Sequence, residues 1–306
     1  MSRPDDSSLT DEQLAIVQRY ANRLLHEASS VGRFPTPVPD LMAAAKVTLV
    51  EDEDLDAGYI ARVMRKAKAG IATLKSALSK VLGLFESRDR IVVIDRIVPA
   101  PKKPFVKLHE TGHGYMPHQS KLYALMQDCD RSLDPDTTDL FEREANVFAA
   151  EVLFQGERFA KEAAEYEFGH RAPIALAKKY GASNYSTFRR YVTTHREVCC
   201  LVVLEPPFHQ EGEEVRAQVR RVIASRSFAA RFAVDILRPD VTPLHPLSSA
   251  IPVPFTRRVV KPHDVWLIDR NCERRLVSVE SFNTTHQILV LIRDKGPAPH
   301  RHIAVD

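Results

Sequence analysis

Residues 109–113 read His-Glu-Thr-Gly-His, and this short stretch constrains both the fold and the chemistry of the chain. Residues four apart in a helix project from the same face, so the imidazoles of His109 and His113 can bind one metal ion together. Glu110 lies on the adjacent part of the helix, within reach of a water molecule on that ion. The pattern therefore predicts two metal ligands, His109 and His113, and a general base, Glu110.

The residues around this motif favour a helix that follows a strand. Pro104 suits the first turn of a helix, and the segment 90–95, with its Ile-Val-Val-Ile core, is typical of a strand. Gly112 and Gly114 each cost a helix about 1 kcal/mol relative to alanine. We therefore expect the backbone of this helix to be closely approached at these two positions.

A catalytic zinc ion normally takes three protein ligands and one water molecule, so a third ligand is expected downstream. The metzincin arrangement would require a glycine at position 116 and a histidine at position 119, where the chain has Met116 and Gln119. That class is excluded. The other common solution is a glutamate on a second helix, and the segment 141–150 provides Glu142 and Glu144 within an apolar helical pattern.

Glu142 is the preferred third ligand. Asn146 follows it by four residues and shares its helix face, so Asn146 can accept a hydrogen bond from the second nitrogen of a ligand histidine. Glu144 lies about 200° around the helix from Glu142 and cannot face the same ion. It stays a fallback ligand, and His118 is a lesser alternative because it is offset from the face of the two histidines.

Hydrolysis of a peptide bond also needs a donor for the negative charge that develops on the carbonyl oxygen. Tyr115, His118 and Tyr123 all lie near the motif in the sequence. The spacing alone does not choose among them.

At these positions the chain resembles the ImmA/IrrE family of metallo-endopeptidases. The resemblance rests on H-E-T-G-H at 109–113, on the strand-like segment 91–95, and on E-R-E-A-N-V-F-A at 142–149. It covers residues 9–160 and continues more loosely to about residue 197. The resemblance implies that His109, His113 and Glu142 bind the metal and that Glu110 is catalytic.

The resemblance also implies a substrate, because members of the family typically cleave a helix-turn-helix repressor of the Xre type and so relieve repression in stress or mobile-element responses. No Xre-like domain precedes the motif, so the expected repressor is a separate chain. The stretch 152–155 lacks the proline that is common there in the family. We expect this difference to affect the substrate groove. Zinc is the expected ion and manganese the alternative, since a His-His-Glu site accepts either.

The sequence predicts an α+β protein in three parts. Residues 1–160 are predicted to form a zincin-like, mainly helical catalytic domain with a small sheet, residues 161–198 a helical module, and residues 199–306 a β-rich region of unknown role. A capping box formed by Thr10 and Gln13 marks a first helix that runs to about residue 28. Further predicted elements are helices at 41–45 and 60–78, two helices between 105 and 156, and strands at 47–50 and 90–95.

The character of the sequence changes near residue 200, where apolar runs become short and β-branched. The pattern predicts one more helix at 213–224 and a linker or long loop at 241–254. The predicted strands are 255–260, 264–269, 275–280 and 287–292.

The segment 172–196 has the pattern of a helix-turn-helix module, with basic residues on both helices. An alternative function follows from it: a metal-sensing transcriptional regulator that binds DNA through 172–196 without proteolysis. A scaffold or repressor-docking role for the same helices is the interpretation that we prefer.

Composition excludes several other classes. The 43 Lys and Arg residues nearly balance the 40 Asp and Glu residues, so overall charge does not favour binding to nucleic acid or membranes. The chain has 11 glycines and neither of the glycine patterns that bind nucleotide phosphates. No apolar run approaches the roughly 18 residues of a spanning helix, residues 1–8 do not resemble a signal peptide, and the four cysteines lack C-x-x-C spacing. We therefore expect a cytoplasmic protein with reduced thiols.

Overall fold

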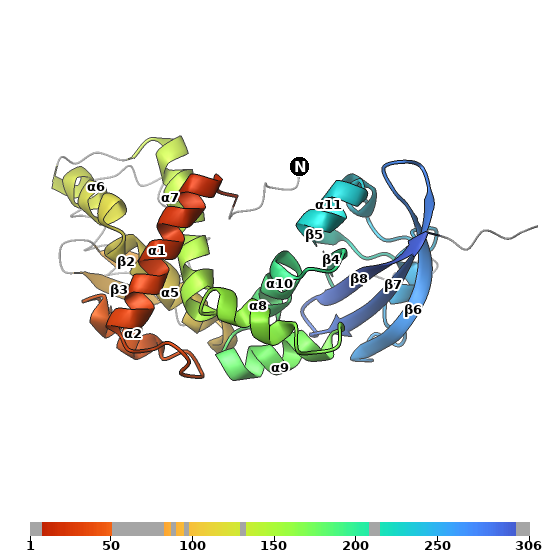
Figure 1. The fold of residues 1–306 in the computed structure, drawn as a ribbon, viewed down its shortest axis with the longest axis horizontal. Helices are drawn as coiled ribbons and strands as arrows, with labels where there is room; N and C mark the ends of the chain where they lie inside the picture. The colour runs from red at the N-terminus through yellow and green to blue at the C-terminus, as the bar shows by residue number, and fades with distance from the viewer. Residues whose placement is uncertain are drawn as a thin grey trace, which may run out of the picture. The chain divides into compact units, whose positions relative to one another are not determined.

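The computed structural model describes residues 8–50, 83–86, 90–94, 98–128, 133–207 and 215–297. These residues form helices and two sheets, so the predicted α+β class is confirmed. The chain folds into two compact units (Figure 1). The amino-terminal unit contains the described residues up to Phe159 together with Ala177–Ser183, and the carboxy-terminal unit contains Ala160–Leu176 together with the described residues from Asn184 onward. The predicted helical module 161–198 contributes to both units, and the three-part division stays a prediction.

Helices make up most of the amino-terminal unit. They are α1 (Asp11–Glu27), α2 (Val38–Ala44), α5 (Lys103–Tyr115), α6 (Pro117–Asp128) and α7 (Pro135–Leu153), and the 3-10 helix η1 (Ala100–Lys102) leads into α5. The predicted capping box at the start of α1 is confirmed, because Gln13 donates its backbone N–H to the Thr10 hydroxyl and Thr10 donates its own to the Gln13 amide oxygen. The predicted helix at 60–78 lies outside the described residues.

A three-stranded sheet accompanies these helices. It consists of β1 (Thr48–Val50), β2 (Gly83–Glu86) and β3 (Ile91–Ile94) in the order β1-β3-β2, with β1 parallel and β2 antiparallel to β3. The strands predicted at 47–50 and 90–95 are therefore confirmed. Helix α5 packs against β2 and β3 and also against α7, which in turn lies alongside α1 (Figure 1).

The contact between α5 and α7 is close because of a glycine. A Cβ atom on Gly112 would lie 2.9 Å from the ring of Phe148 and 3.6 Å from the Cα atom of Ala145. The close approach expected at Gly112 is thus confirmed, and it brings the backbones of the two helices together. The apolar stripe of α7 is buried as predicted, and includes Phe141, Ala145, Phe148 and Val152.

The carboxy-terminal unit is built on a five-stranded antiparallel sheet. Its strands are β4 (Cys199–Leu204), β5 (Val219–Ala224), β6 (Val259–Ile268), β7 (Arg274–Asn283) and β8 (Ile288–Pro297), in the order β5-β4-β8-β7-β6. The other elements are α8 (Glu157–Ala163) and α9 (Arg171–Tyr180), which contribute to both units, and α10 (Asn184–Thr194), α11 (Arg226–Arg231), η2 (Val234–Leu237) and η3 (Ser248–Ala250). One face of the sheet covers a core that includes Phe228, Phe232 and Leu247.

The helix predicted at 213–224 is wrong. Its described part contains β5, which pairs antiparallel with β4 from Leu204 to Cys200. Val215, Val219 and Val222 recur at a helical spacing, but pairing with a fully buried neighbouring strand determines the conformation instead.

The predicted strand 255–260 is mostly wrong, because only Val259 and Val260 are in a strand. They belong to one longer strand, β6 (Val259–Ile268), which also contains most of the predicted strand 264–269. A register shift between Val260 and His263 interrupts its pairing with β7, at the position of Pro262. The segment 241–254 is a loop with buried side chains such as Val241 and Leu247, and not a linker.

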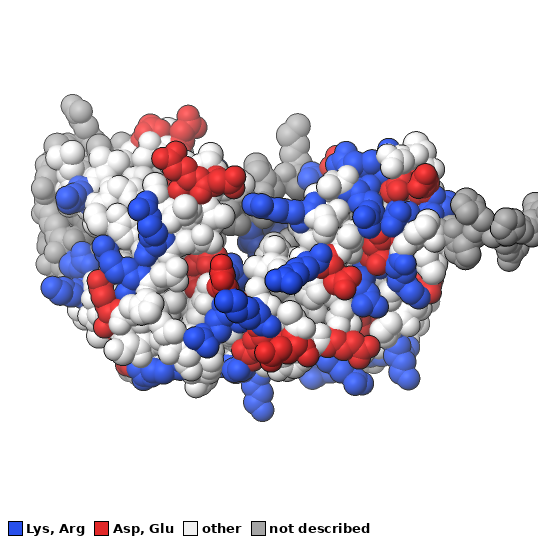
Figure 2. All heavy atoms as spheres, in the orientation of Figure 1, with Lys and Arg blue, Asp and Glu red and all other residues white. Residues whose placement is uncertain are grey.

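The molecular surface carries no single dominant charge on the face drawn in Figure 2, where Lys and Arg side chains intermingle with Asp and Glu side chains. This agrees with the near balance of charges in the sequence. None of the described helices combines the length and the apolar character needed to cross a bilayer. Three of the cysteines, Cys199, Cys200 and Cys272, are free thiols.

Candidate metal centre

Three of the predicted site residues converge in the amino-terminal unit. His109 and His113 lie one turn apart on α5, and Glu142 projects towards them from α7. The possible ligand atoms of the three residues all lie within 4.8 Å of one another. Close packing of the two helices at Gly112 is what allows side chains of ordinary length to meet between them.

The distances in this cluster fit a single tetrahedral ion. The Nε2 atoms of His109 and His113 are 3.2 Å apart, and they lie 3.2 Å and 3.4 Å from the two carboxylate oxygens of Glu142. Zinc binds nitrogen and oxygen at about 2.0–2.2 Å, so two ligand atoms of a tetrahedral site lie about 3.3–3.5 Å apart. The donor set of two imidazoles and one carboxylate is also one that zinc accepts.

The second nitrogen of His109 is held by Asn146. The Nδ1 atom of His109 lies 3.1 Å from the amide oxygen Oδ1 of Asn146. A carbonyl oxygen only accepts, so this contact places the proton on Nδ1 and leaves the electron pair of Nε2 directed at the cluster. This is the contact expected for Asn146 from its position four residues after Glu142.

The second nitrogen of His113 is held by Gln119, which sequence reasoning missed. The amide oxygen of Gln119 lies 2.7 Å from Nδ1 of His113, while its Nε2 donates to Glu144 at 2.6 Å and to the carbonyl of Phe141 at 3.3 Å. These two acceptors fix the orientation of the amide, so its oxygen faces His113. His113 therefore also directs an electron pair of Nε2 towards Glu142.

Glu144 and His118, the fallback ligands, contact each other away from the three converging residues. The Nε2 atom of His118 lies 2.6 Å from a carboxylate oxygen of the buried Glu144, which also accepts from Gln119. Glu144 thus supports the imidazole of His113 indirectly. One feature of the sequence could have indicated that Gln119 orients His113. Its side-chain amide can both donate and accept, and it occupies the position at which metzincins have a histidine ligand.

The electrostatics of the cluster attract positive charge. Burial lowers the pKa of His113, but its hydrogen bond to Glu142 and the charges of Glu110 and Glu142 raise it by more, so the net pKa is raised. Burial raises the pKa of Glu142, but hydrogen bonds from both histidines lower it by more, to well below its usual range. The same three residues can therefore be satisfied by a proton or by a metal ion.

The centre is sheltered on its histidine side and open on its glutamate side. The side chains of His109 and His113 are 12% and 5% exposed, whereas that of Glu142 is 50% exposed. Glu110 is buried and directly follows the candidate ligand His109 on α5. Its charge raises the pKa of both His113 and Tyr123.

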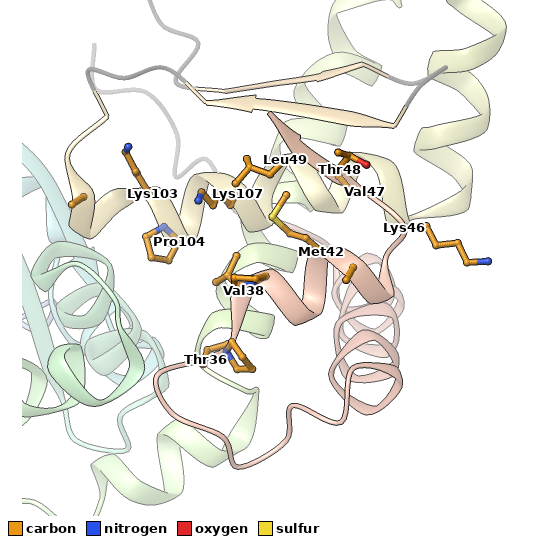
Figure 3. A pocket seen from close by; sticks show the side chains of 14 residues that line it. Thr36, Val38, Met42, Lys46, Val47, Thr48, Leu49, Lys103, Pro104 and Lys107 are labelled. Carbon is orange, nitrogen blue, oxygen red and sulfur yellow. The ribbon is translucent and has the colours of Figure 1, made fainter. Parts of the chain in front are cut away.

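A groove of about 810 Å³ in the same unit lies elsewhere (Figure 3). Its walls come from α2, from β1 and from the first turns of α5, and they include Met42, Leu49, Lys103 and Lys107. None of the three converging residues lines it. Lys103 and Lys107 project from a different face of α5 than His109 and His113, so the groove is not the candidate centre.

A helix that carries His-Glu-x-x-His, with a glutamate from a second helix, defines the class of single-metal peptidase-like sites. Residues 66–189 match the family model of the M78 peptidases, described as the IrrE N-terminal-like domain. The match covers every residue of the centre and supports a peptidase-like hydrolase related to the ImmA/IrrE family.

The structure is similar to that of a Mycobacterium tuberculosis transcriptional regulator, with a TM-score of 0.53 and 11% sequence identity over 91% of this chain and 88% of that chain. At this identity the likeness concerns the fold alone. No curated protein matches the chain in sequence.

Proposed function

We propose that the chain is a zinc-dependent endopeptidase, able also to use manganese, that makes a specific cut in a separate helix-turn-helix repressor of the Xre type and so relieves repression. The observation that carries the proposal is the convergence of the ligand atoms of His109, His113 and Glu142 from two packed helices, with Glu110 beside them. The match to the IrrE N-terminal-like domain supports the same reaction.

His109, His113 and Glu142 would hold the ion, and Asn146 and Gln119 keep both imidazoles in the form that can bind it. A bound divalent ion would make a water molecule more acidic and polarise the scissile carbonyl group.

Glu110 would act as the proton carrier of the reaction. Its carboxylate accepts a proton from the attacking water and then donates that proton to the nitrogen of the leaving amine. Glu110 suits this role because it is buried and lies on α5 between the two candidate ligand histidines.

The choice of a repressor as the substrate rests on the family resemblance. The family whose model matches is the one for which the sequence resemblance implies repressor cleavage. The structural neighbour is described as a transcriptional regulator, which is consistent with a regulatory setting.

The alternative function is a metal-sensing regulator that binds DNA through 172–196. It is favoured by the presence of α9 and α10 as two helices joined by a short turn at 181–183. Against it, the face of α10 that bears Phe188 and Tyr191 is buried, and Arg189 and Arg190 already interact within the chain. We therefore prefer a scaffold role for these helices.

The substitution Glu110→Gln separates the two functions. It removes the proton carrier without removing a ligand, so we expect cleavage of an Xre-type repressor to fall by about 10²- to 10⁴-fold while the metal content stays unchanged. Cleavage is followed by mass spectrometry of the purified repressor, and Glu12→Gln, on the exposed first turn of α1, is the matched control. Cleavage by the Glu110→Gln protein at the wild-type rate would overturn the proposal, as would binding of operator DNA by the wild type without any cut in the repressor.

A further inference from the structure

Peptide hydrolysis at this centre requires a hydrogen-bond donor for the carbonyl oxygen, and the structure distinguishes among the three side chains that lie near the motif in the sequence. Two of them, Tyr115 and His118, are committed to other partners. The third, Tyr123 on α6, has no such partner within the described part of the chain.

Tyr115 faces α1 instead of the metal centre. Its hydroxyl donates to a carboxylate oxygen of Glu27 at 2.7 Å and accepts from Nε of Arg23 at 2.8 Å. Its ring also packs edge-on against Tyr20. Every hydrogen bond of this hydroxyl joins α5 to α1, so Tyr115 serves helix packing.

His118 is bound to Glu144 through Nε2 at 2.6 Å, and its ring packs edge-on against Phe141. The same carboxylate accepts from Gln119, which in turn holds His113. Moving His118 towards a substrate would break this network.

Tyr123 lies against the centre itself. Its ring packs edge-on against the ring of His113, with centroids 5.5 Å apart and planes at 90°, and against Phe141 at 5.6 Å. These contacts fix the ring between a ligand histidine and α7. Among the residues that the structure describes, none forms a hydrogen bond with the Tyr123 hydroxyl.

The hydroxyl of Tyr123 carries a proton that it can donate. A tyrosine ordinarily has a pKa of about 10, so its phenol is protonated at neutral pH. The ring that carries this hydroxyl lies against the ligand His113, so Tyr123 borders the metal centre. A protonated hydroxyl that has no hydrogen-bond partner among the described residues is a donor available to a substrate.

We infer that Tyr123 is a further catalytic residue, which donates a hydrogen bond from its hydroxyl to the oxygen of the scissile carbonyl as negative charge develops there. The tyrosine keeps its proton throughout. The carbon–oxygen bond forms from the attacking water, the carbon–nitrogen bond breaks, and Glu110 transfers the water's proton to the leaving nitrogen. The inference rests on the proposed peptidase function.

The substitution Tyr123→Phe tests the inference, because it keeps the ring contacts with His113 and Phe141 and removes only the hydroxyl. We expect kcat for cleavage of the Xre-type repressor to fall by about 10²- to 10³-fold, with KM, metal content and melting temperature unchanged. The matched control is Tyr115→Phe, which removes a nearby hydroxyl that serves helix packing and should leave kcat at the wild-type value.

A binding measurement provides a second readout. A phosphinic peptide built on the sequence of the observed cut mimics the charged transition state, and its affinity for the Tyr123→Phe protein should fall by the same factor as kcat/KM. An unchanged kcat, or a lower kcat with unchanged affinity for the phosphinic peptide, would overturn the inference while the proposed function stands. Failure of the wild type to cut the repressor or casein would overturn the proposed function and the inference with it.

Discussion

Each of the two units contains a histidine paired with a glutamate, and the two arrangements differ in what the remaining polar atoms do. In the carboxy-terminal unit, His170 donates both its backbone N–H and its Nδ1–H to the two carboxylate oxygens of Glu280, at 2.8 Å and 2.6 Å. The carboxylate is thereby satisfied by a single residue. In the amino-terminal unit, two imidazoles and one carboxylate direct their electron pairs at a common point.

The comparison shows that residue type and burial do not by themselves make a metal site. His170 is 12% exposed, as is His109, whereas Glu280 is 8% exposed and so more buried than Glu142. The His170 ring lies parallel to that of Phe282. What differs is the number of electron pairs that converge, and the presence of Asn146 and Gln119, which set the proton positions on the candidate ligands. We therefore interpret the first pair as a structural contact and propose the second cluster as a metal-binding site.

The largest difference between the two arrangements is expected when one histidine is removed from each. We expect His113→Ala to lose the bound metal and all cleavage, because two ligands remain for an ion that needs three from the protein. We expect His170→Ala to keep the metal and to lower the free energy of unfolding by about 3–5 kcal/mol, because a buried carboxylate loses its partner. Elemental analysis of the purified variants and urea denaturation measure the two effects. Loss of metal from the His170→Ala protein alone would reverse the assignment.

A smaller effect is expected from Gln119→Ala. It leaves all three ligands in place but removes the acceptor that orients His113, so the dissociation constant for zinc should rise by about 10- to 100-fold. Competition with a fluorescent zinc chelator measures this change, and Ser120→Ala is the neighbouring control. An unchanged zinc affinity would mean that packing alone orients His113.

Local signals in the sequence accounted for most of the centre. The spacing of His109 and His113, and the position of Asn146 four residues after Glu142, are properties of a single helix and are visible in the sequence. Gly112 predicted a close approach to the helix backbone, although the sequence did not show that the contact is Phe148 on α7. Each of these features depends on residues within a single helix, so the sequence shows it directly.

The features that the sequence did not reveal depend on contacts between distant segments. The orientation of Gln119 is set by Glu144 on another helix, and the pair of His170 and Glu280 joins residues 110 positions apart. The conformation of Val219–Ala224 is decided by its pairing with β4, which overrides a helix-like spacing of valines. These orientations and conformations are determined by tertiary contacts, which leave no periodic pattern in the sequence.

The most direct test of the metal centre is the X-ray absorption spectrum of the purified protein at the zinc edge. The structure predicts one ion per chain with imidazole nitrogen and carboxylate oxygen ligands at about 2.0–2.2 Å and no sulfur. A sulfur shell at about 2.3 Å, or a protein that retains no zinc after incubation with it, would contradict the assignment of His109, His113 and Glu142 as ligands.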